Sequence, residues 1–401
     1  MPKTKQAVEQ AARLKLYLPQ LDRLEERLIE WTEQDKFQSL IIKSMRYGVP
    51  IFEGGYGAST NDSGVKTDTI CPVFSSTKPV IATLIFILLE QGRLELGDNV
   101  SKFLPEYTGG GREKTTLVHL LTHTHGVDEA FNKSVENYIK DELKIEHPGE
   151  NSTREDRKQY YVKIKQALEL PEDYENQKVW ETVSIRVDLI NQPGKAMAYS
   201  NYGYDRLRDI ICAVTGESID SFAQRVLFEP LEMADSHWTL PKEKYGRVLG
   251  RNERCTGYGF INSENCYNNQ GGGNGLKTTV DDMSRFCEMI LGDGKYNNYR
   301  IISPASIKQM ASNYNSSLPN AWDSWGLGWN YRGTKVDDSG VLRSADSIDH
   351  GGWAGHRILV DAKFGLSVIA FYGQYEGYPD DFGRISNMII AACEDYKYTK
   401  Y

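Results

Sequence analysis

A serine and a lysine stand three residues apart at the start of a long apolar run. The pair is Ser75 and Lys78, and all but one of residues 80–89 are apolar. We expect a buried helix here, because a helix that is apolar on every side lies in a protein core. Pro79 is tolerated only in the first turn of such a helix, so the helix should begin near Ser75 or Ser76.

Ser75 and Lys78 should share one face of that helix, since residues three apart are neighbours on a helix surface. A buried lysine favours its neutral form and can then take a proton from a serine hydroxyl. The same spacing occurs at Ser63 and Lys66, within a polar turn that no helix follows, so we expect Ser75 to be the nucleophile. The alternative is a helix-capping serine beside a surface lysine.

Two later segments also carry side chains suited to chemistry. Tyr199 and Asn201 follow a Pro-Gly turn and lead directly into an amphipathic helical pattern. The run His350-Gly351-Gly352 precedes a strand-like segment. The alternative for the first segment is a packing tyrosine with Asn201 as a helix cap. The alternative for the second is a plain turn before a strand.

Three histidines lie close together at His119, His123 and His125. Spacing of four residues places two of them on one helix face, but the metalloprotease pattern is missing and no third carboxylate lies nearby. This favours hydrogen-bonded structural roles over a metal site, and we expect no cofactor. The glycine-rich run over residues 271–278 fails the phosphate-loop spacing and is interpreted as a backbone turn.

Composition narrows the class of protein. The chain has 401 residues, a net charge of −8 and 40% hydrophobic residues, which allows two domains or one large domain with an insertion. Without a long basic run, nucleic acid and anionic membrane are not expected partners. The amino-terminal residues lack the apolar core of a signal peptide, so we expect a cytoplasmic protein unless a leader was removed. Six scattered cysteines indicate neither disulfides nor a cysteine zinc site.

Hydrophobic periodicity and turn signals predict an order of elements in which helix and hairpin come first, helices occupy the middle, and strands and a helix come last. The predicted elements are a helix over 20–33, a hairpin over 40–53 turning at Tyr47-Gly48, helices over 280–291 and 304–312, strands within 349–361 and 365–372, and a final helix around 385–396.

The three segments at Ser75, Tyr199 and His350, in this order, resemble the serine β-lactamase and penicillin-binding-protein superfamily. Their surroundings are similar to its class C β-lactamase-like branch, which includes the family VIII carboxylesterases. The segment over residues 119–126 looks like that branch's His-Leu-Leu-Thr-His-Thr-Ser-Gly run, with His125 in place of the serine. The resemblance covers roughly residues 40–375.

The resemblance implies an α+β fold in which helices flank an antiparallel sheet. Residues 1–70 and 236–401 would form an α/β sandwich domain, and 71–235 an inserted, mostly helical domain. Residues 128–190 lie outside the resemblance, and their polar composition suggests a solvated, lid-like helical insertion that sets substrate selectivity. The site would lie between the two domains.

The resemblance also implies the chemistry. Ser75 would attack a carbonyl and form an acyl-enzyme. Lys78 and Tyr199 would move its proton, with the choice of general base left open. Backbone N–H groups of Ser75 and Trp353 would form the oxyanion hole. Asn201 would orient Lys78 and the acyl side chain of the substrate.

His350, with Gly351 and Gly352, would contact the substrate where many β-lactamases and DD-peptidases carry lysine. The replacement removes a cation that would hold a substrate carboxylate, which favours a carboxylesterase acting on a small ester or amide. The alternatives are a β-lactamase, a D-alanyl-D-alanine carboxypeptidase or D-aminopeptidase, an acyltransferase, and an inactive binding protein on the same fold. The oligomeric state is left open.

Overall fold

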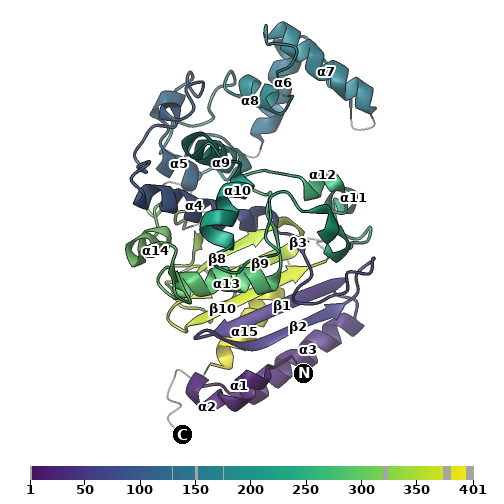
Figure 1. The fold of residues 1–401 in the computed structure, drawn as a ribbon, viewed down its shortest axis with the longest axis vertical. Helices are drawn as coiled ribbons and strands as arrows, with labels where there is room; N and C mark the ends of the chain where they lie inside the picture. Colours follow the sequence, from purple (N-terminus) through teal and green to yellow (C-terminus); the bar gives the residue numbers. More distant parts are fainter. Residues whose placement is uncertain are drawn as a thin grey trace.

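A six-stranded antiparallel sheet, ordered β2-β1-β10-β9-β8-β7, is built from both ends of the chain (Figure 1). The computed structural model describes residues 2–128, 130–149, 152–174, 176–318, 324–373 and 381–393. The sheet strands are β1 (Ser39–Arg46), β2 (Val49–Gly57), β7 (Asn330–Tyr331), β8 (Ile348–Gly352), β9 (His356–Asp361) and β10 (Leu366–Tyr372). Two short pairs lie outside it, β3 (Cys71–Pro72) with β4 (Lys277–Thr278), and β5 (Lys295–Tyr296) with β6 (Tyr299–Arg300).

Helices cover both faces of this sheet, with α3 and α15 on one side and α13 on the other (Figure 1). The helices of this half are α1 (Lys5–Glu9), α2 (Ala11–Leu14), α3 (Leu18–Glu33), α11 (Tyr258–Ile261), α12 (Glu264–Tyr267), α13 (Val280–Leu291), α14 (Pro304–Met310) and α15 (Asp381–Ala391). The fold is therefore the expected α+β arrangement of an antiparallel sheet flanked by helices.

Strand β1 shows how the sequence builds the two layers. Leu40 and Ile42 pack in the cluster that contains α3 and α15, whereas Ile41 packs in the cluster on the opposite face. This is the two-residue period of a strand buried on both sides. The hairpin turns where predicted, because Tyr47 and Gly48 both have positive φ, at 48° and 77°, as a type I′ turn requires.

The middle of the chain is helical and contains α4 (Lys78–Glu90), α5 (Leu117–Leu121), α9 (Asn201–Thr215) and α10 (Ile219–Ala223). Helix α4 is buried over almost its whole length and packs against α9. Its apolar residues join the core cluster that also receives Ile358 and Val360 from the sheet. The expected boundaries between a sandwich domain and a helical domain stay a prediction.

The segment expected to be a solvated insertion forms three helices, α6 (Phe131–Asp141), α7 (Arg154–Ala167) and α8 (Asn176–Ser184), at the top of Figure 1. They enclose an apolar cluster of their own, made of Val127, Phe131, Val135, Ile139, Tyr160, Ile164, Leu168, Val179 and Val183. The insertion is thus a small packed unit and not merely a solvated surface. Tyr202 of α9 joins it to the rest of the protein, with its ring 5.3 Å from that of Phe131.

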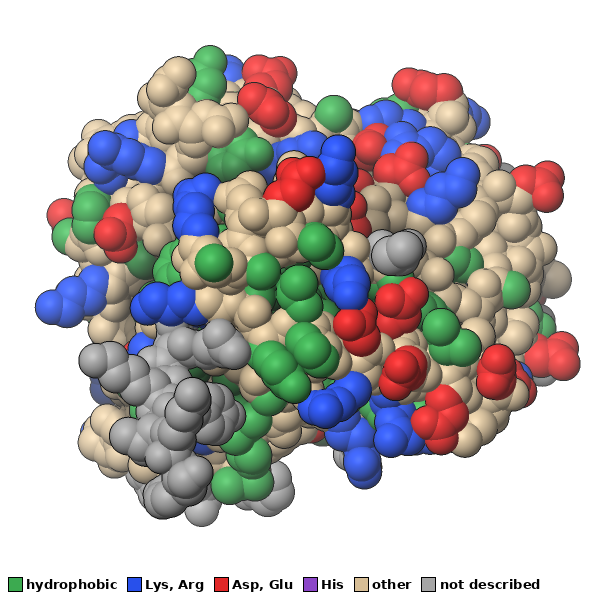
Figure 2. Space-filling view, turned by 90° about the horizontal axis from the view of Figure 1, so that it is seen from below, with side chains coloured by type: hydrophobic (Ala, Val, Ile, Leu, Met, Phe, Trp, Pro, Cys, Tyr) green, Lys and Arg blue, Asp and Glu red, His purple; other side chains and the backbone are tan. Residues whose placement is uncertain are grey.

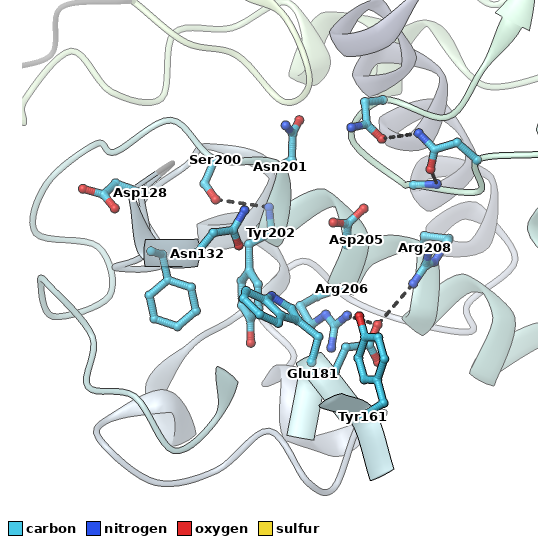
Figure 3. A pocket seen from close by; sticks show the side chains of 15 residues that line it. Asp128, Asn132, Tyr161, Glu181, Ser200, Asn201, Tyr202, Asp205, Arg206 and Arg208 are labelled. Atoms are coloured by element: carbon cyan, nitrogen blue, oxygen red, sulfur yellow. Dashed lines mark hydrogen bonds and ion pairs between the residues drawn. The ribbon is translucent and has the colours of Figure 1, made fainter. Parts of the chain in front are cut away.

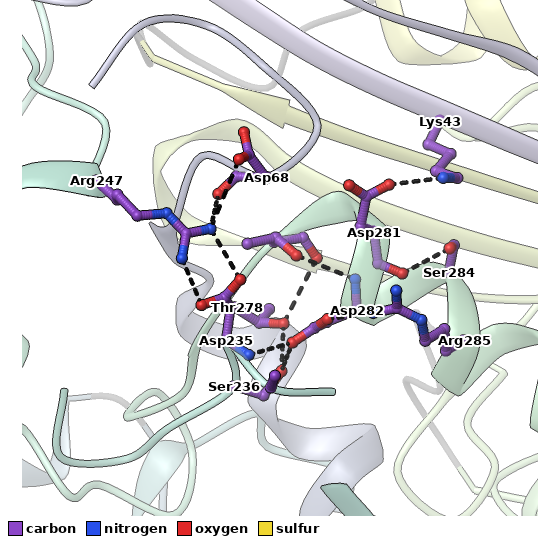
Figure 4. Close-up of polar contacts among 12 residues, drawn as sticks. Lys43, Asp68, Asp235, Ser236, Arg247, Thr278, Asp281, Asp282, Ser284 and Arg285 are labelled. Carbon is purple, nitrogen blue, oxygen red and sulfur yellow. Dashed lines mark hydrogen bonds and ion pairs between the residues drawn. The ribbon is translucent and has the colours of Figure 1, made fainter. Parts of the chain in front are cut away.

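A buried polar network ties the middle of the chain to the sheet (Figure 4). The Asp282 carboxylate accepts hydrogen bonds from the Ser236 hydroxyl at 2.9 Å and from the Asp235 N–H at 2.8 Å. The preceding residue in the same first turn of α13, Asp281, pairs with Lys43 of β1 at 2.6 Å. These contacts fix α13, and the short strand β4 that precedes it, against the sheet.

The outer face below the sheet mixes charges of both signs. Among the residues coloured in Figure 2, lysines and arginines lie interspersed with aspartates and glutamates, and apolar side chains are scattered between them. Within the part of the chain that the structure describes, no helix combines the length and the apolar character needed to cross a bilayer.

Candidate active site

The serine and lysine meet where a tight turn passes into α4. Residues Phe74–Thr77 form a 3₁₀ turn, and the α-helix itself begins at Lys78 with Pro79 in its first turn. The helix therefore starts two or three residues later than predicted, although the chain already turns helically at Ser75. Gly92, with φ of 68°, follows the end of the helix, where a left-handed residue is common.

Lys78 is the centre of the site. Its side chain is fully buried, and Nζ lies 3.0 Å from Ser75 Oγ, 2.7 Å from Asn201 Oδ1 and 3.0 Å from the carbonyl oxygen of Gly273. The ring of Tyr199 lies beside the same ammonium, with its centroid 4.6 Å from Nζ. The structure thus brings together four of the predicted residues, which come from two segments about 120 residues apart.

The three acceptors around Nζ suit a lysine that changes protonation state. An ammonium has three N–H donors and no acceptor, and Ser75, Asn201 and Gly273 satisfy all three donors. A neutral amine would keep its bonds to Asn201 and Gly273 and accept the Ser75 proton on its lone pair. The geometry therefore allows proton transfer between Ser75 and Lys78 without rearrangement of the site.

Aromatic rings pack around Tyr199. The rings of His123 and Trp325 lie 4.4 Å and 5.8 Å from that of Tyr199. His123 Nδ1 accepts a hydrogen bond from the Ser200 N–H at 3.2 Å, so its proton resides on Nε2. Burial, and then the Lys78 charge, holds the pKa of His123 well below its usual value. His123 is a neutral structural neighbour of the site.

His350 lies in β8 as a neutral ring, and not in a plain turn. Its Nδ1 is 2.6 Å from the carbonyl oxygen of Gly351, and since a carbonyl only accepts, Nδ1 carries the proton and Nε2 bears the lone pair. Burial, reinforced by the charge of Lys78, lowers the pKa of His350 to about 3. The position therefore presents a buried hydrogen-bond acceptor and no positive charge.

The end of β8 lies tightly against the turn that carries Ser75. A Cβ on Gly352 would collide with the carbonyl oxygen of Val73, so only glycine allows this approach. Phe74 has an uncommon positive φ of 46°, and its ring meets that of Trp353 edge to face at 5.0 Å. Trp353 thus follows a strand that touches the turn carrying Ser75, while the pairing of its N–H with that of Ser75 as an oxyanion hole stays a prediction.

The remaining candidates lie outside this centre. His119 caps α5, with Nδ1 accepting from the Thr116 N–H at 3.1 Å. His125 is buried, and burial lowers its pKa to about 4. Within the described ranges, no three histidine, cysteine or acidic side chains are grouped as metal ligands. Ser63 lies in a turn, with its hydroxyl 2.8 Å from that of Ser59.

The tyrosine segment corrects one alternative interpretation. Ser200, and not Asn201, caps α9, because its hydroxyl accepts from the Tyr202 N–H at 3.1 Å. This leaves the Asn201 side chain available for Lys78. Sequence patterns cannot reveal the Gly273 acceptor, which is a backbone carbonyl. Helical spacing could have indicated Asp205 as a further residue of the site, because it stands one helical turn after Asn201. Its carboxylate accepts a hydrogen bond from the Gly272 N–H at 2.7 Å.

A cavity of about 580 Å³ opens beside Asn201 (Figure 3). It is lined by Asp128, Phe131, Asn132, Tyr161, Trp180, Glu181, Ser200, Asn201, Tyr202, Asp205, Arg206, Arg208, Asn269, Gly271 and Asn274. Ser75 and Lys78 are not among these residues, so the cavity lies next to Ser75 and not over it. Asn201 connects the cavity to the polar centre around Lys78, because it lines the cavity and accepts a hydrogen bond from Lys78.

This fold, with a serine and a lysine at the mouth of a buried helix, defines a class of serine enzymes that work through an acyl-enzyme. A family model described as Beta-lactamase matches residues 21–392, and the chain belongs to this family, within the serine β-lactamase and penicillin-binding-protein superfamily. Members of the family are serine hydrolases, including amidases, carboxypeptidases and esterases.

Individual relatives are distant. The chain is 23% identical to an N-acetylmuramyl-L-alanine amidase of Bacillus subtilis over 82% of its length and 73% of that protein. It is 24% identical to the D-alanyl-D-alanine-carboxypeptidase/endopeptidase AmpH of Escherichia coli, over 77% of this chain and 72% of that protein. Among solved structures, a family VIII carboxylesterase superposes with a TM-score of 0.71 at 16% identity, covering 93% of this chain and 98% of the other.

Proposed function

We propose that the protein is a carboxylesterase that forms an acyl-enzyme at Ser75 and hydrolyses small esters. One observation carries this proposal: the catalytic lysine is fully engaged by Ser75, Asn201 and Gly273, and the neighbouring His350 is neutral. The centre is thus organised for acyl transfer, and the His350 side chain offers no positive charge to a substrate carboxylate.

The proposed reaction has two halves. Ser75 Oγ attacks the ester carbonyl, and its proton passes to the Lys78 and Tyr199 pair. The tetrahedral intermediate collapses as the C–O bond breaks, and the departing alcohol takes the proton. Water then attacks the acyl-enzyme, with Lys78 and Tyr199 removing its proton and returning it to Ser75 as the acid leaves.

Charge on the developing oxyanion needs donors fixed in advance. The backbone N–H groups of Ser75 and Trp353 are proposed for this role, each worth about 3 kcal/mol in the transition state by analogy with measured oxyanion holes. The close contact between Gly352 and the turn at Val73 supports it, because that contact brings β8 up to the nucleophile.

Substrate preference follows from His350. A β-lactam or a peptide C-terminus carries a carboxylate, and a neutral histidine whose Nε2 is an acceptor repels that group instead of pairing with it. Nearby, Arg357 is already paired with Asp338. An ester without a carboxylate loses nothing at this position. The amidase and carboxypeptidase relatives keep an amide substrate as the second possibility.

The test compares kcat/KM for p-nitrophenyl butanoate with that for a chromogenic cephalosporin. We expect the ester to be preferred by orders of magnitude, and His350→Lys to narrow the gap by improving turnover of the anionic substrate. Circular dichroism of the variant checks its fold. Efficient cephalosporin turnover by the wild type would rule out the esterase assignment.

A further inference from the structure

The cavity beside Asn201 has a chemical character that the reaction at Ser75 does not explain. We propose that it binds the far end of the substrate's acyl group and selects acyl groups that end in a positively charged amine. This inference rests on the proposed acyl-enzyme chemistry and adds a substrate class to it. Its evidence comes from where the cavity lies, which of its charges are already paired, and which rings line it.

The position of the cavity fits a remote part of the substrate. Asn201 accepts from Lys78 on one side and faces the cavity on the other, so two hydrogen bonds, through Asn201 and Lys78, connect the cavity wall to Ser75 Oγ. A volume of about 580 Å³ is typical of sites that enclose a small molecule. An acyl chain attached to Ser75 would have to extend past Asn201 to fill it.

Both cations in the lining are already paired with acids. Arg206, only 4% exposed, lies 2.7 Å from Glu181 and 2.8 Å from Asp209. Arg208 forms an ion pair with Asp209 as well and lies 3.6 Å from Glu181. Two arginines and two carboxylates make a neutral group, so neither arginine is available to hold an anionic substrate.

Two further carboxylates line the cavity, Asp205 and Asp128, and neither forms an ion pair within 4 Å with a residue that the structure describes, although Asp205 lies close enough to Arg208 to raise the pKa of that guanidinium. Asp205 accepts hydrogen bonds from the backbone N–H groups of Gly272 and Gly273. Asp128 makes no side-chain hydrogen bond or ion pair within the described part of the chain, and Figure 3 shows it apart from the Glu181 and arginine group. The cavity is therefore negative overall and disfavours a second carboxylate.

Aromatic rings in the cavity lining are a second feature that would favour binding of a positively charged group. Tyr161, Trp180, Tyr202 and Phe131 line the cavity together with these acids. Ring faces attract cations, and Tyr202 already has the guanidinium of Arg206 5.2 Å from its ring centroid. Carboxylates among ring faces are a suitable environment for an ammonium group, and an alkyl chain would leave the acids unused.

Matched p-nitrophenyl esters test this directly. In the first set, heptanoate, 6-aminohexanoate and the pimelate half-ester differ only in a terminal methyl, ammonium or carboxylate. A second set, two carbons longer, allows for the distance from Ser75. We expect kcat/KM for the amine ester to exceed that for the neutral ester by about tenfold in at least one set, as a charged contact typically gives, and the anionic ester to be the poorest.

Two substitutions at Asp128 assign the effect to the cavity. Asp128→Asn should lower the amine-to-neutral ratio of kcat/KM, and Asp128→Lys should reverse the order so that the anionic ester exceeds the amine ester. Asp141→Asn, at an exposed position at the end of α6, is the matched control and should leave the ratio as in the wild type. Raised salt should reduce the amine preference of the wild type.

The possible outcomes separate the two proposals. If no ester of either set is turned over and Ser75 is not acylated, the proposed function fails. If the esters are turned over but the neutral or anionic ester is best in both sets, the proposed function stands and the amine subsite is wrong. An amine preference that Asp128→Lys does not change would also contradict the assignment to this cavity.

Discussion

At the scale of single residues, the site depends on how Lys78 is held. A buried ammonium is costly unless its donors are satisfied, and here each donor has an acceptor, at Ser75, Asn201 and Gly273. The Tyr199 ring beside Nζ favours the charged form, whereas burial favours the neutral form. Because Ser75 is one of the three acceptors, a proton passed between Ser75 Oγ and Lys78 Nζ would leave the hydrogen bonds to Asn201 and Gly273 in place.

The first prediction tests Lys78 as a base. Arginine keeps the charge but does not deprotonate in a protein, so Lys78→Arg should acylate nearly as slowly as Lys78→Ala. Tyr199→Phe should cost at least ~10²-fold by loss of proton transfer. Because the two groups act together, the double variant that combines Lys78→Ala with Tyr199→Phe should acylate little more slowly than the slower of these two single variants.

Pre-steady-state acylation by one activated ester measures all four variants against the wild type. A Lys78→Arg variant that acylates normally would show that Lys78 is electrostatic only. If the double variant lost acylation rate by the product of the two single losses, Tyr199 would act independently of Lys78.

At the scale of elements, α9 positions the lysine through two of its residues. Asn201 and Asp205 are four apart and share a face. The first accepts from Lys78, and the second accepts from the N–H groups of Gly272 and Gly273 at 2.7 and 3.4 Å. Since the carbonyl of Gly273 also accepts from Lys78, Asp205 is a positioning residue that holds the glycine loop in place.

The second prediction concerns this loop. Asp205→Ala should lower kcat on the order of 10²-fold by displacing the Gly273 carbonyl, as small misplacements of reacting groups do. Asp205→Asn keeps an oxygen acceptor at Oδ1 and should recover most of that loss. Steady-state kinetics with a neutral ester separates kcat from KM. Equal losses in both variants would show that the charge of Asp205, and not its hydrogen bonds, matters.

At the scale of the whole molecule, the site is held between a sheet made from both chain ends and a helical middle. Helix α13 joins the two, through the Asp282 network and through the contact of Glu288 with Ser367 of β10 at 3.1 Å. Burial raises the pKa of Glu288 to about 7 and that of Asp282 to about 6. Both acids are therefore more stable protonated in the folded state than in the unfolded chain.

The third prediction follows from the sign of that shift. A carboxyl whose folded pKa lies above its unfolded value binds more protons when folded, so its contribution to stability falls as pH rises through the interval between them. For Glu288 this interval runs from 4.5 to about 7. The free energy of unfolding of the wild type, relative to Glu288→Gln, should therefore decrease from pH 4.5 to pH 7.

Urea unfolding at several pH values measures this difference, and Glu33→Gln, at an exposed position on α3, is the control that should show no such trend. A difference that stays constant or increases with pH would mean that Glu288 is not a raised-pKa acid in the folded protein.

The sequence predicted those parts of the site that depend on side-chain type and local pattern. Pro79 and an apolar run mark the buried helix that carries Lys78, and two strand-like runs that meet at Tyr47-Gly48 mark the hairpin; the structure confirms both elements. The Gly273 carbonyl could not be predicted, because every residue has one and only the tertiary fold brings it to Lys78. Likewise, polar composition concealed the apolar cluster of the insertion, whose contributing residues are spread over three helices.

The central claim is that Ser75 is a nucleophile activated by its contact with Lys78. Stoichiometric labelling with a fluorophosphonate, followed by intact mass and peptide mapping, tests it most directly, with Ser75→Ala and Ser63→Ala as the matched pair. We expect one label per chain, carried by Ser75, in the wild type and in Ser63→Ala, and none in Ser75→Ala. A label on Ser63, or a folded wild type that takes up no label, would contradict the account.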